Sequence, residues 1–319
     1  MRRRNDLPHA EGTDPPSIRR APVIYLHGML YTALGRAVSI ALATLLVFGL
    51  VLLREATSPS GDGYWRAMAA APRGDLYLAD EVHRELRLVH PGGGWERLAA
   101  VPGGVFRALA ADGPNLLLAT EGRLYVSTDT GSTWRAALPG RFTAVAVRGR
   151  TEYAAAWADG IYLSENAGAT WSKAVVPAGD TEFQALIPGF AGTLLGLLES
   201  TDGGHTWNRV AGIPDRITAV SYNGNSGLVR AGDWRGVLWL YDPLRGEVAG
   251  RSSYPGGVEA VEGSVVATTG GVYPDRGGPL HGREVTRLVL SGDNYFAAAA
   301  RGPFYVSGDG THWRLAYQG

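Results

Sequence analysis

The sequence contains no cysteine among its 319 residues. Disulfide bonds, thiolate metal sites, iron–sulfur clusters, cysteine nucleophiles and lipid-modified cysteines are therefore excluded. Lysine is almost absent as well, because Lys173 is the single lysine among 30 basic residues. Since Lys173 does not follow a glycine-rich loop, a phosphate-binding P-loop is excluded too.

An excess of charge of one sign is also missing. The 30 basic residues balance 30 acidic residues, so the formal net charge is zero. Nucleic-acid-binding domains usually carry a basic face, and the balance indicates that nucleic acid is not a partner. The motifs HExxH, GxSxG, GxGxxG and the EF-hand loop do not occur, and the histidines show no metal-ligand spacing. We therefore predict no catalytic residue, no metal site and no cofactor.

One long uncharged run, AVSIALATLLVFGLVLL, extends from Ala37 to Leu53. It is short for a hydrocarbon core about 30 Å thick, but residues 31–35 extend it if the Arg36 guanidinium reaches the interface. We predict a transmembrane helix at 31–54. A cleaved signal peptide is the alternative, against which stand the 36 residues before the run and the lack of a small-residue cleavage site after it.

Arginines are concentrated on the N-terminal side of this run, at positions 2, 3, 4, 19, 20 and 36. The positive-inside rule then predicts a single-pass protein of the inner (plasma) membrane with its N-terminus in the cytoplasm. The expected parts are a flexible cytoplasmic tail (1–30), the transmembrane helix (31–54), a Ser/Gly/Pro linker (55–63) and an extracytoplasmic domain (64–319).

Glycine is abundant, at 45 residues or about twice the usual share of ~7 per cent. Much of it belongs to a repeated turn, whose first three copies, STDTGSTW, SENAGATW and STDGGHTW, start 37 and 36 residues apart. A shorter copy, SGDGTHW, starts at Ser307. The turn residues are Ser127, Asp129, Gly131, Thr133 and Trp134; Ser164, Asn166, Gly168 and Trp171; Ser200, Asp202, Gly204 and Trp207; and Ser307, Asp309 and Trp313.

A second pattern has the same period. Short alternating apolar runs begin at Trp65, Phe106, Phe142, Phe183, Ile217, Val258 and Thr286. Each is followed by further strand-like runs, which makes about four short strands per unit, the size of a propeller blade. The sequence therefore predicts an all-β, seven-bladed β-propeller over 64–319. Units four and six are degenerate, because Ala185–Ser200 is short for two strands and VYPDRGGPLHGRE lacks the turn.

The SxDxGxTW turn resembles the Asp-box, or bacterial neuraminidase repeat. In such a turn the carboxylate accepts backbone N–H groups, glycine supplies a positive φ and tryptophan fills a seam between blades. The likeness covers 64–319 and is greatest to the photosystem II stability and assembly factors, with sialidases and sortilin-type ectodomains more distant. It implies a non-catalytic extracytoplasmic scaffold that binds other membrane or extracytoplasmic proteins.

A sialidase-type exo-glycosidase on the same propeller is the alternative. Likeness to sialidases implies three arginines around a substrate carboxylate, an acid/base Asp and a Tyr–Glu nucleophile pair, and the sequence does not identify such a set. Phe106-Arg107 is followed by Ala-Leu, whereas the sialidase motif continues with Ile-Pro.

The loops opposite the repeated turns contain arginine and tryptophan, which are favoured anchors of protein interfaces. We predict a partner-binding patch there, against the alternative that each arginine is a solvated charge paired with a nearby carboxylate. The patch comprises Arg141, Arg216, Trp234, Arg235 and Arg301.

Overall fold

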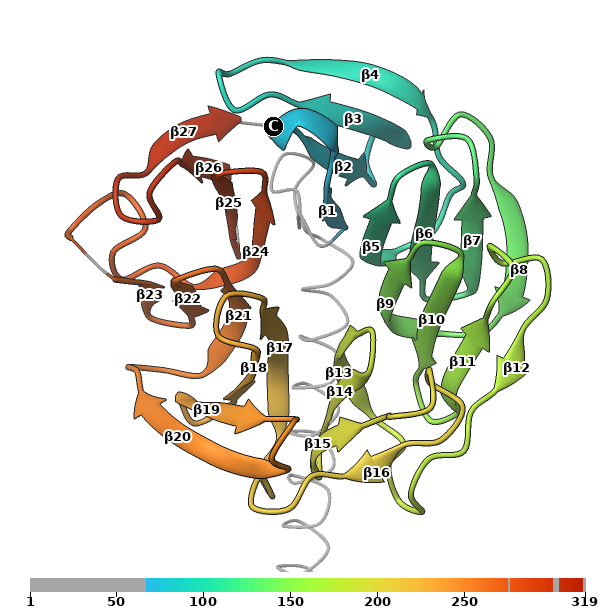
Figure 1. Ribbon diagram of the computed structural model, residues 1–319. Coiled ribbons are helices and arrows are strands. Elements are labelled where there is room, and N and C mark those ends of the chain that lie inside the picture. Colours follow the sequence, from blue (N-terminus) through green and yellow to red (C-terminus); the bar gives the residue numbers. More distant parts are fainter. Residues whose placement is uncertain (1–66, 275, 301–303, 318–319) are drawn as a thin grey trace, which may run out of the picture. The chain divides into compact units, whose positions relative to one another are not determined.

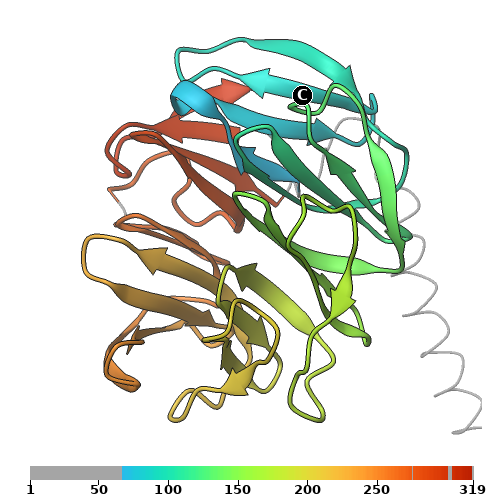
Figure 2. The ribbon, with the colours of Figure 1, turned by 45° about the vertical axis from the view of Figure 1, so that its right-hand side comes forward.

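Seven antiparallel sheets follow one another around a central axis, each formed by one contiguous stretch of chain (Figure 1). The structure is a computed structural model, and it describes residues 67–274, 276–300 and 304–317. Within every sheet the strands run in sequence order from the axis to the periphery, and the sheets are tilted like blades in the side view of Figure 2. The predicted seven-bladed β-propeller is confirmed.

The first three blades have four strands each. Blade 1 has β1 (Met68–Ala70), β2 (Leu76–Asp80), β3 (Glu85–Val89) and β4 (Trp95–Ala100), with the one-turn helix η1 (Pro72–Gly74) after β1. Blade 2 has β5 (Phe106–Asp112), β6 (Asn115–Thr120), β7 (Arg123–Ser127) and β8 (Arg135–Pro139). Blade 3 has β9 (Phe142–Arg148), β10 (Thr151–Ala156), β11 (Gly160–Ser164) and β12 (Ser172–Lys173).

The other four blades include the two degenerate units. Blade 4 has β13 (Phe183–Ile187), β14 (Phe190–Thr193), β15 (Gly196–Glu199) and β16 (Asn208–Arg209). Blade 5 has β17 (Ile217–Asn223), β18 (Leu228–Asp233), β19 (Val237–Asp242) and β20 (Glu247–Ser253). Blade 6 has β21 (Val258–Glu262), β22 (Val265–Thr268) and β23 (Gly271–Tyr273). Blade 7 has β24 (Val285–Ser291), β25 (Asn294–Ala299), β26 (Phe304–Ser307) and β27 (Arg314–Tyr317).

The sequence indicates that Ala185–Ser200 is short for two strands, but blade 4 forms all four of its strands. In blade 4 the two middle strands shrink to four residues each, so both still fit between Ala185 and Ser200. In blade 6 the unit without the turn motif forms three strands. The loop after β23 supplies Leu280, which is 2% exposed and packs with Val272 and Leu288 in place of a fourth strand.

The core consists of seven apolar clusters, and each joins two consecutive blades. The cluster between blades 7 and 1 includes Leu76 and Leu78 from β2 and Phe296 from β25. A hydroxyl supports this junction, because Ser291 Oγ donates to the Ala71 carbonyl at 2.9 Å. Among the described residues the two ends of the chain share no sheet, so side-chain packing closes the ring.

Six of the seven innermost strands share one irregularity. In β5, β9, β13, β17, β21 and β24 the pairing with the second strand shifts by one residue, as in a β-bulge. The extra residue is polar in every case and lies near the start of the strand. These residues are Arg107, Thr143, Gln184, Thr218, Glu259 and Thr286. Bulges thus place a ring of polar residues at one end of the central channel.

Within the described residues no helix is long and apolar enough to cross a membrane. The transmembrane helix predicted at 31–54 lies outside the described residues, as do the predicted tail (1–30) and linker (55–63).

Glu152 is the exception to the apolar packing between blades 2 and 3. It lies on β10 opposite Ser164, the position that Leu116 occupies opposite Ser127 in blade 2. Its side chain lies beneath the repeated turn of blade 3, since a Cβ at Gly168 would be 2.7 Å from Glu152 Oε2. Neither carboxyl oxygen has a hydrogen-bond partner among the described residues. Burial raises the pKa of Glu152 to about 7, and the nearby Arg135 guanidinium opposes this shift.

The Glu152 carboxyl makes stability depend on pH. Because its pKa is higher in the folded than in the unfolded state, its stabilisation is complete below about pH 4.5 and is lost as the pH rises to about 7. We expect Glu152→Gln to match the wild type at pH 4 and to exceed it at pH 8 by on the order of 2 kcal/mol. Chemical denaturation of the full-length chain across this range measures the difference.

The control for Glu152 is Glu165→Gln, because the Glu165 side chain is 68% exposed. The pH dependence should be reduced by Glu152→Gln without being abolished, since burial also raises the pKa of Glu262 to about 7. Identical pH profiles for the wild type and Glu152→Gln would contradict the assignment.

Candidate interaction face

The alternating strand directions sort the loops of the propeller onto two faces. We call one the entry face; it carries the loops between blades and those between the second and third strands, at 81–84, 121–122, 157–159, 194–195, 234–236 and 269–270. The chain enters the first blade on this face, because the Ala79 amide beside loop 81–84 donates to the Ala67 carbonyl at 3.0 Å. The opposite face, with the SxDxGxTW turns, is the turn face.

A repeated backbone hydrogen bond organises the entry face. In each of blades 2 to 7, the carbonyl just before the first strand accepts an N–H from the end of the second strand or the loop after it. The donor and acceptor pairs are Glu121 and Val105, Trp157 and Arg141, Leu194 and Glu182, Trp234 and Arg216, Thr269 and Gly257, and Ala300 and Glu284. An arginine and a tryptophan therefore lie side by side at equivalent positions in blades 3 and 5.

In blade 5 the predicted patch forms around Asp215, a residue that the sequence did not single out. Asp215 Oδ1 accepts the Trp234 indole N–H at 2.9 Å, and Asp215 Oδ2 lies 3.1 Å from Arg235 Nη1. The Arg235 guanidinium stacks 5.1 Å from the centre of the Trp234 ring. Trp234 remains 49% exposed, so one carboxylate fixes the indole and the guanidinium at the surface.

Arg141 belongs to a second group, in blades 2 and 3. Its guanidinium lies 4.8 Å from the Trp157 ring centre and 3.8 Å from a Glu121 carboxylate oxygen, and Glu121 also pairs with Arg107. The structure thus separates Arg141 from the Asp215 group, and Arg301 lies outside the described residues. The sequence analysis did not single out Trp157. An alignment of the loop sequences AWADG and DWRG would have shown that Trp157 corresponds to Trp234.

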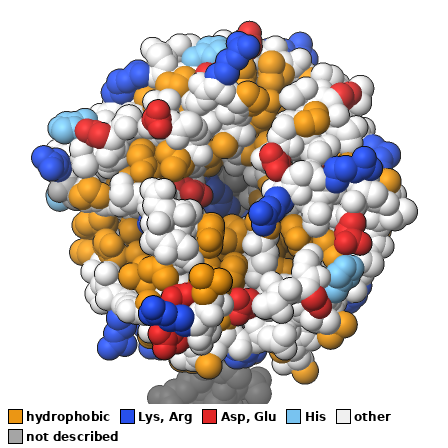
Figure 3. Space-filling view, in the orientation of Figure 1, with side chains coloured by type: hydrophobic (Ala, Val, Ile, Leu, Met, Phe, Trp, Pro, Cys, Tyr) orange, Lys and Arg blue, Asp and Glu red, His pale blue; other side chains and the backbone are white. Residues whose placement is uncertain are grey.

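The mouth of the central channel lies between these groups and contains charges of both signs. The Arg287 guanidinium donates to the Thr286 carbonyl at 2.7 Å and reaches the Arg107 carbonyl at 3.4 Å. The pKa of Glu259 is raised by burial and by the neighbouring Glu284, whereas Arg287 and Arg216 lower it. Figure 3 shows the hollow at the centre of the propeller with acidic and basic side chains along its wall.

On the turn face, the repeated turns are closed by hydrogen bonds. In blade 2, Ser127 Oγ accepts the Gly131 amide at 2.8 Å and donates to Asp129 Oδ1 at 2.8 Å. Asp129 then accepts the Thr133 amide at 2.9 Å and the Thr133 hydroxyl at 2.6 Å. Asp202 repeats this arrangement in blade 4 with Ser200 and Thr206.

In two copies of the turn, a different residue type replaces the aspartate acceptor or the threonine donor. In blade 3, Asn166 Oδ1 accepts the Thr170 amide at 2.9 Å, as the aspartates do. In blade 7, His312 Nδ1 lies 2.6 Å from Asp309 Oδ2 and replaces the threonine hydroxyl. The four tryptophans of these turns each contact the cluster shared with the preceding blade; they are Trp134, Trp171, Trp207 and Trp313. These contacts connect the exposed turns to the core.

The residue types that a sialidase site would need, namely three arginines and a Tyr–Glu pair, do not meet on one face of this propeller. Arginines 107, 216 and 287 are near the channel mouth on the entry face, where Arg107 pairs with Glu121 and Arg287 with backbone carbonyls. A Tyr–Glu pair does occur, because the Tyr241 hydroxyl donates to Glu199 Oε2 at 2.7 Å. It lies at the turn-face ends of β19 and β15, so it does not meet the arginines. No group of three or more potential metal ligands occurs among the described residues.

Comparison with known proteins identifies the fold alone. An ancestral GH74 enzyme superimposes with a TM-score of 0.62 at 14% identity, covering 81% of this chain and 47% of the enzyme. The extracellular domain of a protein described as a one-component system from B. thetaiotaomicron gives a TM-score of 0.58 at 12% identity, covering 77% of this chain and 38% of that one. This chain thus spans less than half of either protein.

YCF48 from Cyanidioschyzon merolae gives a TM-score of 0.48 at 16% identity, covering 82% of this chain and 88% of YCF48, which is too distant to support an argument. No family model and no curated protein matches the sequence. These propellers differ widely in function, so the site must be interpreted from its own residues.

The aspartates of the repeated turns should make the stability of the protein depend on pH. The Thr133 hydroxyl, the Thr133 amide and the Ser127 hydroxyl lower the pKa of Asp129. Because that pKa is lower in the folded state, the stabilisation from Asp129 is present above its unfolded pKa of about 3.9 and is lost as the pH falls. We expect Asp129→Asn to destabilise the protein at pH 7 and to have a smaller effect at pH 2.5, measured by thermal unfolding.

Blade 3 provides the matched control, because Asn166 occupies the same place. Asn166→Asp should add a stabilisation that is complete above about pH 4 and is lost as the pH falls below it. If neither variant changes the pH dependence of the melting temperature, the turn carboxylates do not have this role.

Proposed function

We propose that this protein is a membrane-anchored, extracytoplasmic scaffold that binds another protein through the entry face of its propeller without catalysing a reaction. The observation that carries the proposal is that the equivalent tryptophans of blades 3 and 5 each stack with an arginine, Trp157 with Arg141 and Trp234 with Arg235. Each pair is exposed at the end of a rigid strand. Exposed, preorganised arginine and tryptophan are the side chains that dominate binding energy at protein interfaces.

The pairs are preorganised because acidic residues hold the arginines in place. Asp215 and Glu121 position the guanidinium groups beside the rings, and Trp234 and Trp157 remain exposed. A partner therefore meets side chains whose conformational entropy is already reduced. Arg216, whose carbonyl accepts the Trp234 amide, extends the proposed contact surface. The predicted patch residue Arg301 lies outside the described residues.

The anchor is the transmembrane helix at 31–54, supported by the uncharged run and the arginines before it. The hydrogen bonds of the repeated turns support membership of the Asp-box superfamily. Together with the Arg–Trp pairs they favour an interaction or assembly platform of the kind represented by the photosystem II assembly factors. The exo-glycosidase alternative is less favoured, because the arginines at the channel mouth and the Tyr241–Glu199 pair lie on opposite faces.

Charge reversal tests the interaction face. We expect the double variant Arg141→Glu with Arg235→Glu to lose most co-purification of its partner from native membranes, because each change places two carboxylates together beside a tryptophan. Quantitative mass spectrometry of the purified complex measures the loss. Arg245→Glu on the turn face is the matched control, since Arg245 also pairs with carboxylates and its side chain is 74% exposed. Partners retained by the double variant would contradict the proposed surface.

The enzymatic alternative has a direct assay. We expect no release of fluorophore from a fluorogenic sialoside by the purified full-length chain. Turnover that is lost in Tyr241→Phe would overturn the non-catalytic proposal. Turnover that persists in this variant would instead indicate a contaminating enzyme.

A further inference from the structure

Large exposed apolar side chains gather on the entry face. Five of its loops each present one, and their exposed fractions range from 36% to 62%. They are Val82, Val105, Trp157, Leu195 and Trp234, from blades 1 to 5. The other large exposed apolar side chains of the described residues are scattered: Tyr222 and Leu244 lie at the turn-face side of blade 5, and Trp95, Leu98, Val175 and Leu315 lie in or beside outer strands. The entry face thus has an apolar arc on one side of the charged channel mouth.

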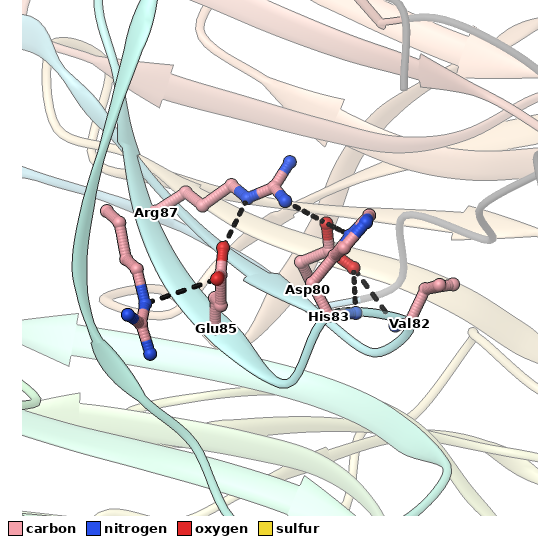
Figure 4. Close-up of polar contacts among 6 residues, drawn as sticks. Asp80, Val82, His83, Glu85 and Arg87 are labelled. Atoms are coloured by element: carbon pink, nitrogen blue, oxygen red, sulfur yellow. Dashed lines mark hydrogen bonds and ion pairs between the residues drawn. The ribbon is translucent and has the colours of Figure 1, made fainter.

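The loops that present this arc are held in fixed conformations. Asp80 Oδ1 accepts the amides of Val82 and His83 at 2.9 and 3.0 Å, and Asp80 Oδ2 lies 3.0 Å from the buried Arg87 guanidinium. Figure 4 shows this network at the base of the loop that carries Val82. In blade 4, the Leu195 amide donates to Thr193 Oγ1 at 3.1 Å. The apolar side chains therefore stay in water unless another surface covers them.

Along the chain, the entry face is separated from the predicted membrane anchor by a short segment. The described chain begins at Ala67 on this face, and only residues 54–66 separate it from the apolar run that ends at Leu53. Thirteen residues span at most about 45 Å when fully extended and roughly 20 Å on average as a flexible chain. A tether this short gives the face a high effective concentration at the bilayer surface, so weak contacts suffice for docking.

We infer that the entry face docks onto the lipid bilayer surface, with Val82, Val105 and Leu195 in the interfacial region and Trp157 and Trp234 at headgroup level. The inference rests on the membrane anchor of the proposed function. Tryptophan is suited to this zone because its ring is apolar and its N–H is polar. The side chains that make the proposed contact are uncharged, so docking does not require anionic lipid. A partner then reaches the Arg–Trp pairs at the membrane surface.

The absence of cysteine allows a direct test. Single cysteines at Val82 or Leu195 on the entry face, and at Tyr222 or Leu244 on the turn face, can each carry an environment-sensitive fluorophore. The full-length chain is reconstituted in vesicles of phosphatidylcholine alone and of phosphatidylcholine with phosphatidylglycerol. We expect shallow spin-labelled lipids to quench the entry-face labels about threefold more than the turn-face labels in both compositions, because an interfacial contact buries side chains by about 5–10 Å.

Three results would overturn the inference. Equal quenching on both faces would show that the propeller does not dock by its entry face. Entry-face quenching confined to vesicles with phosphatidylglycerol would replace interfacial apolar contact with charge attraction. Entry-face labels that are exposed in pure lipid and protected only in native membranes would assign the face to a protein partner. Vesicle flotation separates these outcomes from failure of the proposed function, because a chain without an anchor would not float with the lipid.

Discussion

The packing between neighbouring blades is the constraint on which the rest of this structure depends. A single blade of three or four short strands cannot bury both of its faces, and each of the seven apolar clusters is shared by two blades. The ring must therefore close before any blade is fully buried. Blades 7 and 1 are held together by side chains such as Leu78 and Phe296 and by the Ser291 hydroxyl. Among the described residues, no strand from one end of the chain joins the sheet of the other end.

Closure of the ring also separates the protein into a structural face and a face available for interaction. On the turn face, polar side chains such as Asp129 and Asp202 form hydrogen bonds within their own turns. A tryptophan packs beneath each of the four repeated turns. On the entry face, one repeated backbone hydrogen bond fixes the loops, which leaves the side chains free to vary between blades. Blades 3 and 5 use this freedom to present Arg–Trp pairs, and other blades present Val82 or Leu195.

Most of the fold could be predicted from the sequence, because a repeat of about 37 residues and the period-two alternation both reflect local strand geometry. The number of blades, the position of the turns and the irregularity of blades 4 and 6 all follow from it. The candidate site was predictable only in part. Trp234 and Arg235 were identified from their position in the loops of the repeat, and the same alignment could have identified Trp157. Asp215 could not be identified in this way, because its importance comes from its contacts with Trp234 and Arg235 in another loop. The structure shows that Arg141 and Arg235 have different acidic partners, Glu121 and Asp215, and their membership of one binding patch stays a prediction.

The sequence by itself determined the repeat, the turns and the direction in which every strand runs, since these depend on neighbouring residues and on glycine at positive φ. Only the tertiary structure decided which side chains share an environment. It brought Glu152 beneath the turn of blade 3, where burial raises its pKa, and it separated the channel-mouth arginines from the Tyr241–Glu199 pair. The physical reason is that burial and charge pairing depend on distances between blades, and these distances exist only after the ring has closed.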